Sequence, residues 1–119
     1  MRRTLVTRLG FIVFAAALGL VGTVRPALAA GRDAEKGAKV YAAQKCSMCH
    51  SIAGKGGKSS PLDGVGKKLS AGDIRAWIAT PIEAAAKAKS TKKPLMPAKY
   101  GTLPAADLDG LVAYMQSLK

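Results

Sequence analysis

The chain has 119 residues and a mass of 12.3 kDa, which leaves room for one small domain and excludes a large multidomain enzyme. Its 19 Lys and Arg residues outnumber its seven Asp and Glu residues, so the formal net charge is +12. A protein this basic attracts anionic surfaces, which are nucleic acids, acidic proteins or anionic membranes.

The N-terminal 29 residues are typical of a signal peptide. Three arginines precede an apolar run over residues 9–24, and the small-residue sequence Ala-Leu-Ala at 27–29 suits cleavage by a signal peptidase. The run is shorter than the roughly 20 apolar residues of a membrane-spanning helix, and glycines interrupt it. We therefore predict export by general secretion and cleavage after Ala29. Retention of the segment as an N-terminal anchor is the alternative.

Cleavage would leave residues 30–119 as one domain of 90 residues, with 15 basic against seven acidic residues and a formal charge of +8. Export argues against nucleic acid as a target, so acidic proteins or anionic membrane surfaces become the expected targets. Of these two, a membrane contact is expected only if the N-terminal segment is kept. A domain of this size has a thin apolar core and needs a further source of stability.

The pattern beyond the signal predicts helices joined by loops rich in Gly, Pro and Lys, without a strand pair. A first helix is expected from Asp33, a good capping residue, to about Lys45. Residues 52–68 contain many glycines and one proline, and we expect them to form a loop.

Three further helical segments are expected in the C-terminal half. Ser70 and Asp73 form a capping-box arrangement, and the helix they start should end at Thr80, before a proline. A short helical turn is expected over 83–87. The last helix begins near Pro104 and has an apolar stripe made of Leu108, Leu111, Val112, Met115 and Leu118. The predicted fold class is therefore all-α.

Residues 46–50 read Cys-Ser-Met-Cys-His and hold both cysteines and the only histidine of the chain. The pattern C-x-x-C-H is the attachment motif of c-type haem. Two thiols three positions apart lie on one side of a helical turn, where each can add to one of the two vinyl groups at a porphyrin edge. His50 would then face the iron.

Other uses of the two cysteines explain this motif less well. A disulfide is common in exported proteins, but it would close a very small loop and leave His50 unexplained. A thioredoxin-like redox site expects a strand, helix and strand around it. A structural zinc site needs four ligands, and the chain has no further Cys or His. We therefore expect covalently bound haem.

The chain resembles class I bacterial cytochromes c from about residue 33 to residue 119. Gly37 and Tyr41 lie in a segment that looks like the family's first helix, whose glycine and aromatic residue pack against the last helix. Their matching partners here would be Leu111 and Tyr114. The resemblance implies a small fold of helices and loops wrapped around one haem, which is attached through its cysteines.

The resemblance also implies which residues hold the haem and its iron. Cys46 and Cys49 would carry the haem, and His50 would be the proximal iron ligand. Met96 lies in a Leu-Met-Pro sequence that resembles the family's distal methionine loop, so it would be the second axial ligand. A methionine in the last helix, Met115, is more often a core residue than a ligand.

Two further residues match the haem site of the family. After the attachment motif the family places a proline whose carbonyl accepts the N–H of the proximal histidine, and Pro61 is similar in context. Trp77 is either a core residue or a residue that lines the haem and approaches a propionate. Pro104 stands where relatives often have Ser or Thr, and the segment 83–93 is not diagnostic of a subgroup, so the physiological partner is left open.

An iron with His and Met in both axial positions has no vacant site for a substrate, and thioether ligation raises the potential. The expected function is therefore electron transfer between redox partners by a periplasmic, monomeric, monohaem protein that is not an enzyme. One alternative is a haem subunit or docking module of a larger oxidoreductase complex. The other is a peroxidase-like or gas-binding haem protein, for which Met96 would have to leave the iron.

Lysines are expected to border the exposed haem edge if the fold resembles the family. Lys92, Lys93 and Lys99 bracket Met96, and Lys45 immediately precedes Cys46. Lys67 and Lys68 would extend this ring. An acidic redox partner would be drawn to such a surface. The alternative is that these lysines only keep the protein soluble.

Overall fold

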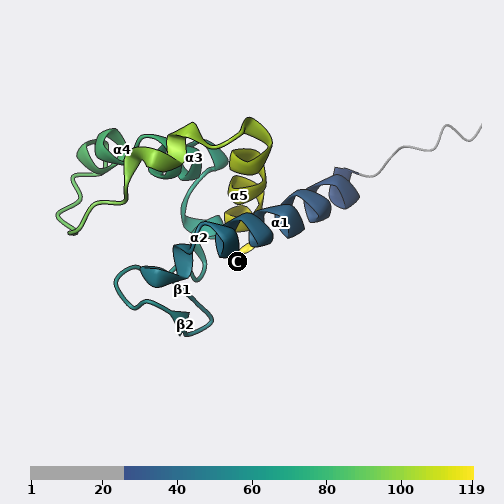
Figure 1. Cartoon of the computed structure of the whole chain (residues 1–119), viewed down its shortest axis with the longest axis horizontal. Helices are drawn as coiled ribbons and strands as arrows, with labels where there is room; N and C mark the ends of the chain where they lie inside the picture. The colour runs from purple at the N-terminus through teal and green to yellow at the C-terminus, as the bar shows by residue number, and fades with distance from the viewer. Residues whose placement is uncertain (1–25) are drawn as a thin grey trace, which may run out of the picture.

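The computed structural model describes residues 26–119 (Figure 1). The predicted signal peptide over 1–29 therefore lies almost entirely outside the described residues, and only its last four belong to the described part. No helix within residues 26–119 combines the length and the apolar character that crossing a bilayer requires. The helical elements are α1 (Pro26–Ala43), η1 (Cys46–Met48), α2 (Val65–Lys68), α3 (Ala71–Ala79), α4 (Pro81–Lys87), η2 (Ala98–Thr102) and α5 (Ala105–Ser117). They confirm the predicted all-α class.

The segment expected to be a loop over 52–68 contains regular structure, so the prediction that no strand pair exists is wrong. β1 (Ser51–Ile52) and β2 (Lys55–Gly56) form a short antiparallel hairpin, and α2 follows it. The turn residues Ala53 and Gly54 have φ angles of 51° and 76°. Two successive positive φ angles give the turn that matches the twist of paired strands. The glycines that indicated a loop thus permit a tight reversal.

Most helix boundaries agree with the sequence pattern. The Ser70 hydroxyl accepts a hydrogen bond from the N–H of Asp73 at 3.1 Å, and α3 ends at Ala79, one residue before the predicted end at Thr80. α4 begins at Pro81 rather than at residue 83, because a proline suits the first position of a helix. The first helix is longer than predicted, since α1 begins at Pro26 and not at Asp33.

α1 crosses α5, and these two helices make the most extensive contact between elements of the described part (Figure 1). Gly37 is buried at the crossing, where a side chain would overlap the carbonyl oxygen of Gly110. One turn further along α1, the ring of Tyr41 meets the ring of Tyr114 edge to face, with centroids 5.7 Å apart. The predicted packing of Gly37 and Tyr41 against the last helix is therefore observed with Tyr114 as a partner, whereas the residue of α5 nearest to Gly37 is Gly110 rather than the predicted Leu111.

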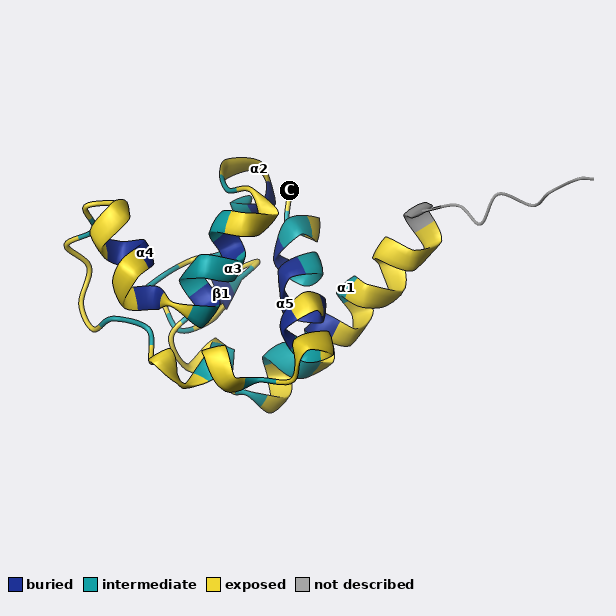
Figure 2. Ribbon diagram, turned by 90° about the horizontal axis from the view of Figure 1, so that it is seen from above, coloured by how far each residue is buried: buried dark blue, intermediate teal, exposed yellow. Residues whose placement is uncertain are grey.

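The apolar core lies between α3 and α5 (Figure 2). Its buried residues are Ile74, Ile78, Leu108, Leu111, Val112 and Met115. α2 is tied to the end of α5, because the N–H of Gly66 donates to the carbonyl of Leu118 at 2.9 Å. The side-chain amide of Gln116 donates to the carbonyl of Leu69 at 2.9 Å as well. This core is small, as the length of the domain predicts.

We predict that Gly37→Ala destabilises the protein by about 1–3 kcal/mol, because the new methyl group forces α1 away from α5. Gly72→Ala is the matched control, since a methyl group there would have its nearest neighbour, the Ser70 hydroxyl oxygen, at 3.8 Å. Alanine also favours the helix over glycine, so this variant should be as stable as the natural protein or slightly more stable. Urea unfolding of both proteins measures the difference. A Gly37→Ala variant with natural stability would contradict the packing described.

Candidate functional site

The Cys-Ser-Met-Cys-His segment forms one tight turn directly after α1. Lys45 lies two residues after the end of α1 and has a left-handed backbone conformation, with a φ of 55°, directly before η1. The N–H groups of Cys49 and His50 both donate to the carbonyl of Cys46, at 3.2 and 3.0 Å. The two cysteines form no disulfide, and Cys46 is half-buried whereas Cys49 is exposed. The turn therefore keeps two thiols and one imidazole within five residues of chain.

The β1–β2 hairpin and the residues after it pack their backbone against this turn. The N–H of Gly57 donates to the carbonyl of Ser47 at 2.8 Å. A side chain at Gly57 would overlap the carbonyl of Met48, and one at Gly56 would overlap the carbonyl of His50. Only glycine allows this approach, so the two glycines fix the position of the turn.

The imidazole of His50 is held by a backbone carbonyl. Its Nδ1 lies 2.9 Å from the carbonyl oxygen of Ser60. A carbonyl only accepts, so Nδ1 carries the proton and donates it, and the neutral ring then has a free lone pair on Nε2. This is the arrangement of a metal-binding histidine, whose second nitrogen is oriented by a hydrogen bond.

The acceptor for His50 differs from the predicted one by one residue. We expected the carbonyl of Pro61, and the structure uses the carbonyl of Ser60. The reason is the course of the chain, because the N–H of Ser60 donates to Cys49 at 3.3 Å and the N–H of Leu62 donates to Ser51 at 2.9 Å. These two bonds hold residues 60–62 beside residues 49–51, and the Ser60 carbonyl then points at the ring of His50.

A tyrosine that the motif does not include also contacts His50. The hydroxyl of Tyr41 on α1 donates to the carbonyl oxygen of His50 at 3.2 Å. Burial raises the pKa of Tyr41 above its usual value, so the hydroxyl keeps its proton at neutral pH. The sequence pattern indicates Tyr41 only as a helix-packing residue. The aromatic ring signalled that packing, whereas nothing in the sequence signalled the target of the hydroxyl.

Met96 and Trp77 are both half-buried but differ in what they contact. Met96 lies on the segment between α4 and η2 and packs against the edge of the core. Trp77 is on α3 but is not among the residues that pack against this core. The role of Trp77 at the haem therefore stays a prediction.

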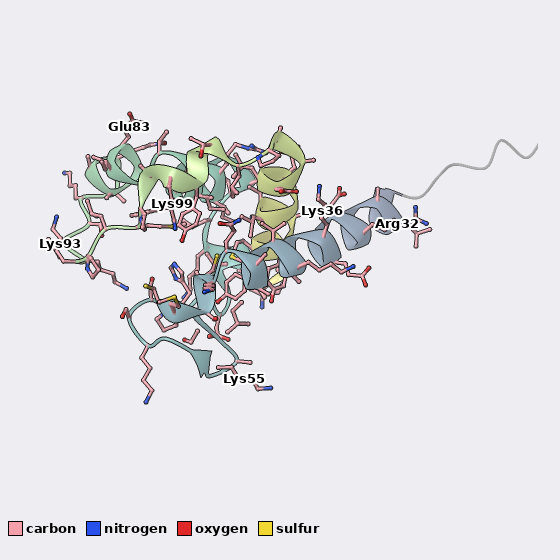
Figure 3. The ribbon with its side chains drawn as sticks, in the orientation of Figure 1. Arg32, Lys36, Lys55, Glu83, Lys93 and Lys99 are labelled. Atoms are coloured by element: carbon pink, nitrogen blue, oxygen red, sulfur yellow. The ribbon has the colours of Figure 1, made fainter. Side chains whose placement is uncertain are left out.

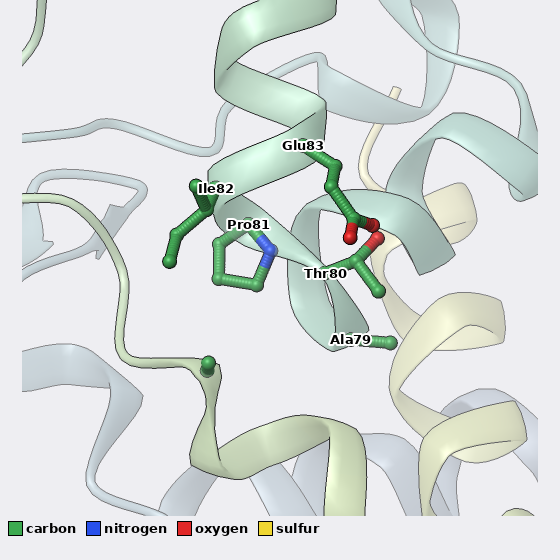
Figure 4. A pocket seen from close by; sticks show the side chains of 6 residues that line it. Ala79, Thr80, Pro81, Ile82 and Glu83 are labelled. Atoms are coloured by element: carbon green, nitrogen blue, oxygen red, sulfur yellow. The ribbon is translucent and has the colours of Figure 1, made fainter.

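Of the cavities that border residues 26–119, one lies beside α4 and another between α1 and α5, and neither of these is lined by the Cys-Ser-Met-Cys-His turn. A cavity of about 150 Å³ lies where α4 starts, close to η2; Figure 4 shows Pro81, Ile82 and Glu83 at its edge. Ile82 is 64% exposed there, although it is a large apolar residue. Within residues 26–119 no three His, Cys, Asp or Glu side chains lie close enough together to hold a metal ion.

A comparison with protein-family models matches residues 34–119 to the family described as cytochrome c. The chain belongs to the cytochrome c family. Comparisons with curated proteins and with solved structures gave no match. The helical fold agrees with the class I members that the sequence resembles.

Membership of the family means that this cytochrome carries covalently bound haem c with its iron, and that it is a haem-binding electron-transfer protein. The residues present fit the group. Cys46 and Cys49 belong to the C-x-x-C-H motif and are not joined in a disulfide, and the Nε2 lone pair of His50 is available because Nδ1 is already bonded. Members of this family are typically electron carriers rather than enzymes.

Proposed function

We propose that this cytochrome is a periplasmic monohaem carrier of single electrons, attached to its haem through Cys46 and Cys49, with His50 and Met96 as axial ligands. When bound, the haem supplies one-electron chemistry between ferric and ferrous iron. The observation that carries the proposal is the hydrogen bond from Nδ1 of His50 to the Ser60 carbonyl at 2.9 Å. It fixes the tautomer, orients the ring and strengthens Nε2 as a donor.

The exposure of the methionines supports Met96 as the second axial ligand. Met48 is 75% exposed to solvent, and a thioether in contact with water makes a poor ligand for a haem inside the protein. Met115 is only 6% exposed and belongs to the core between α3 and α5. Met96 is shielded in part and lies on a segment without helix or strand, so its sulfur is free to turn toward the iron.

Export is supported by the signal-like N-terminal segment and by the beginning of α1. Residues 28–33 are all exposed, and Leu28 is 65% exposed although it is apolar. Cleavage after Ala29 would therefore remove no buried side chain at positions 28 and 29. The domain over 30–119 would keep the crossing of α1 with α5, because the crossing is centred on Gly37.

Exposed lysines support an acidic redox partner. Lys92, Lys93 and Lys99 are exposed around Met96, and Lys45 is exposed beside the attachment turn. The three ion pairs found among residues 26–119 are Lys36–Asp107, Arg75–Asp109 and Lys87–Asp73. None of them uses these four lysines, so their charges stay available to a partner. Figure 3 shows Lys93 at one end of the molecule and Arg32 at the other.

We predict that Met96→Ala lowers the reduction potential, abolishes the weak near-infrared sulfur-to-iron band of the oxidised protein and opens the iron to carbon monoxide or cyanide. The control is Met48→Ala, which removes an exposed methionine and should leave all three properties unchanged. Optical titration of the two purified holoproteins measures them. If the band and the potential survive in Met96→Ala, another residue is the ligand.

We predict that Lys92→Glu/Lys93→Glu slows electron transfer to an acidic partner protein by about tenfold at low ionic strength, with a smaller loss as salt rises. Arg32→Glu/Lys39→Glu is the control, because it changes the net charge equally on exposed residues of α1. Bimolecular rates of both variants across a salt series separate local docking from net charge. Equal losses would show that only net charge matters, which would contradict a docking surface at Lys92 and Lys93.

A further inference from the structure

Three hydrogen bonds from three parts of the chain hold His50. Its N–H donates to the carbonyl of Cys46 at 3.0 Å, and its ring donates to the carbonyl of Ser60 at 2.9 Å. Its own carbonyl accepts from the hydroxyl of Tyr41 at 3.2 Å. The first bond closes the turn and the second sets the tautomer. The third connects the turn to the pair of long helices.

Helix packing alone does not explain the hydroxyl of Tyr41. The edge-to-face contact with Tyr114, with ring planes at 69°, needs only the aromatic ring. A phenylalanine would make the same contact with no polar group to satisfy in a half-buried place. The hydroxyl instead reaches the residue that follows the second attachment cysteine, nine positions along the chain.

The carbonyl of His50 is also enclosed from a second direction. Gly56 approaches it so closely that a side chain there would overlap the oxygen. The carbonyl therefore lies between the Tyr41 hydroxyl and the backbone of β2. With both neighbours in place, the backbone of His50 has little freedom to rotate. The backbone sets the point from which the side chain extends, and the bond from Nδ1 to the Ser60 carbonyl sets the plane of the ring.

We propose that Tyr41 is a positioning residue for the axial ligand, in that its hydroxyl ties His50 to the crossing of α1 and α5. Gly37 sets how closely α1 approaches α5, and Tyr41 lies one turn further along the same face. The docking of the two helices is thereby transmitted to the orientation of the imidazole. This inference rests on the proposed role of His50 as an axial ligand.

The test compares two variants that each remove one hydroxyl from the tyrosine pair. Tyr41→Phe keeps the aromatic contact and deletes the bond to His50. Tyr114→Phe is the matched control, because the Tyr114 hydroxyl forms no hydrogen bond within residues 26–119. In purified holoprotein, Tyr41→Phe should speed hydrogen exchange at the His50 backbone amide by about fivefold, the value of one net hydrogen bond. It should also shift the paramagnetic resonances of the His50 ring and the reduction potential.

Tyr114→Phe should leave the exchange rate, the ring resonances and the potential at their natural values. Equal changes in both variants, or none in Tyr41→Phe, would overturn the positioning role. If Tyr41→Phe does not yield holoprotein, the natural protein decides: a hydroxyl proton of Tyr41 that exchanges with solvent at the rate of a free phenol overturns the inference, and a protected one supports it. Absence of paramagnetic shifts on the His50 ring of the natural protein would contradict the axial role itself, whatever Tyr41 does.

Discussion

The attachment turn over residues 46–50 packs its backbone directly against the backbone of Gly56 and Gly57, and the rest of the site depends on this contact. Because no side chain separates the backbone of the turn from the backbone of Gly56 and Gly57, the turn has one position relative to the hairpin. The segment that follows the hairpin is then placed to offer the Ser60 carbonyl to the ring of His50. A backbone contact thus determines which imidazole nitrogen stays free.

The site also accounts for the stability of so small a domain. Six buried residues form the core between α3 and α5, and the crossing of α1 with α5 adds a second contact around Gly37. A covalently attached haem adds apolar surface to the core and a covalent connection that the chain alone lacks. Attachment of the haem therefore stabilises the folded state. Met96 and Trp77 are half-buried and are not among the six buried core residues.

Features that depend on residue type could be predicted from the sequence. The attachment motif, the cap at Ser70 and the apolar stripe of α5 each need particular side chains at particular spacings, and the structure places the cap and the stripe as expected. Features that depend on the backbone could not be predicted. The sequence does not mark Ser60 as the acceptor for His50, because every residue has a backbone carbonyl. The glycines of the hairpin could not be told apart from the glycines of an irregular loop.

The covalent link at the attachment turn is the central claim, and haem retention tests it most directly. Natural protein and the double variant Cys46→Ala/Cys49→Ala, expressed with the machinery for haem attachment, are extracted with acidified acetone, and the haem left in each protein pellet is measured by absorption. Natural protein should keep its haem in the pellet, and the double variant should release any haem that it binds and fold poorly. Haem that stays with the double variant after extraction would contradict attachment through these two cysteines.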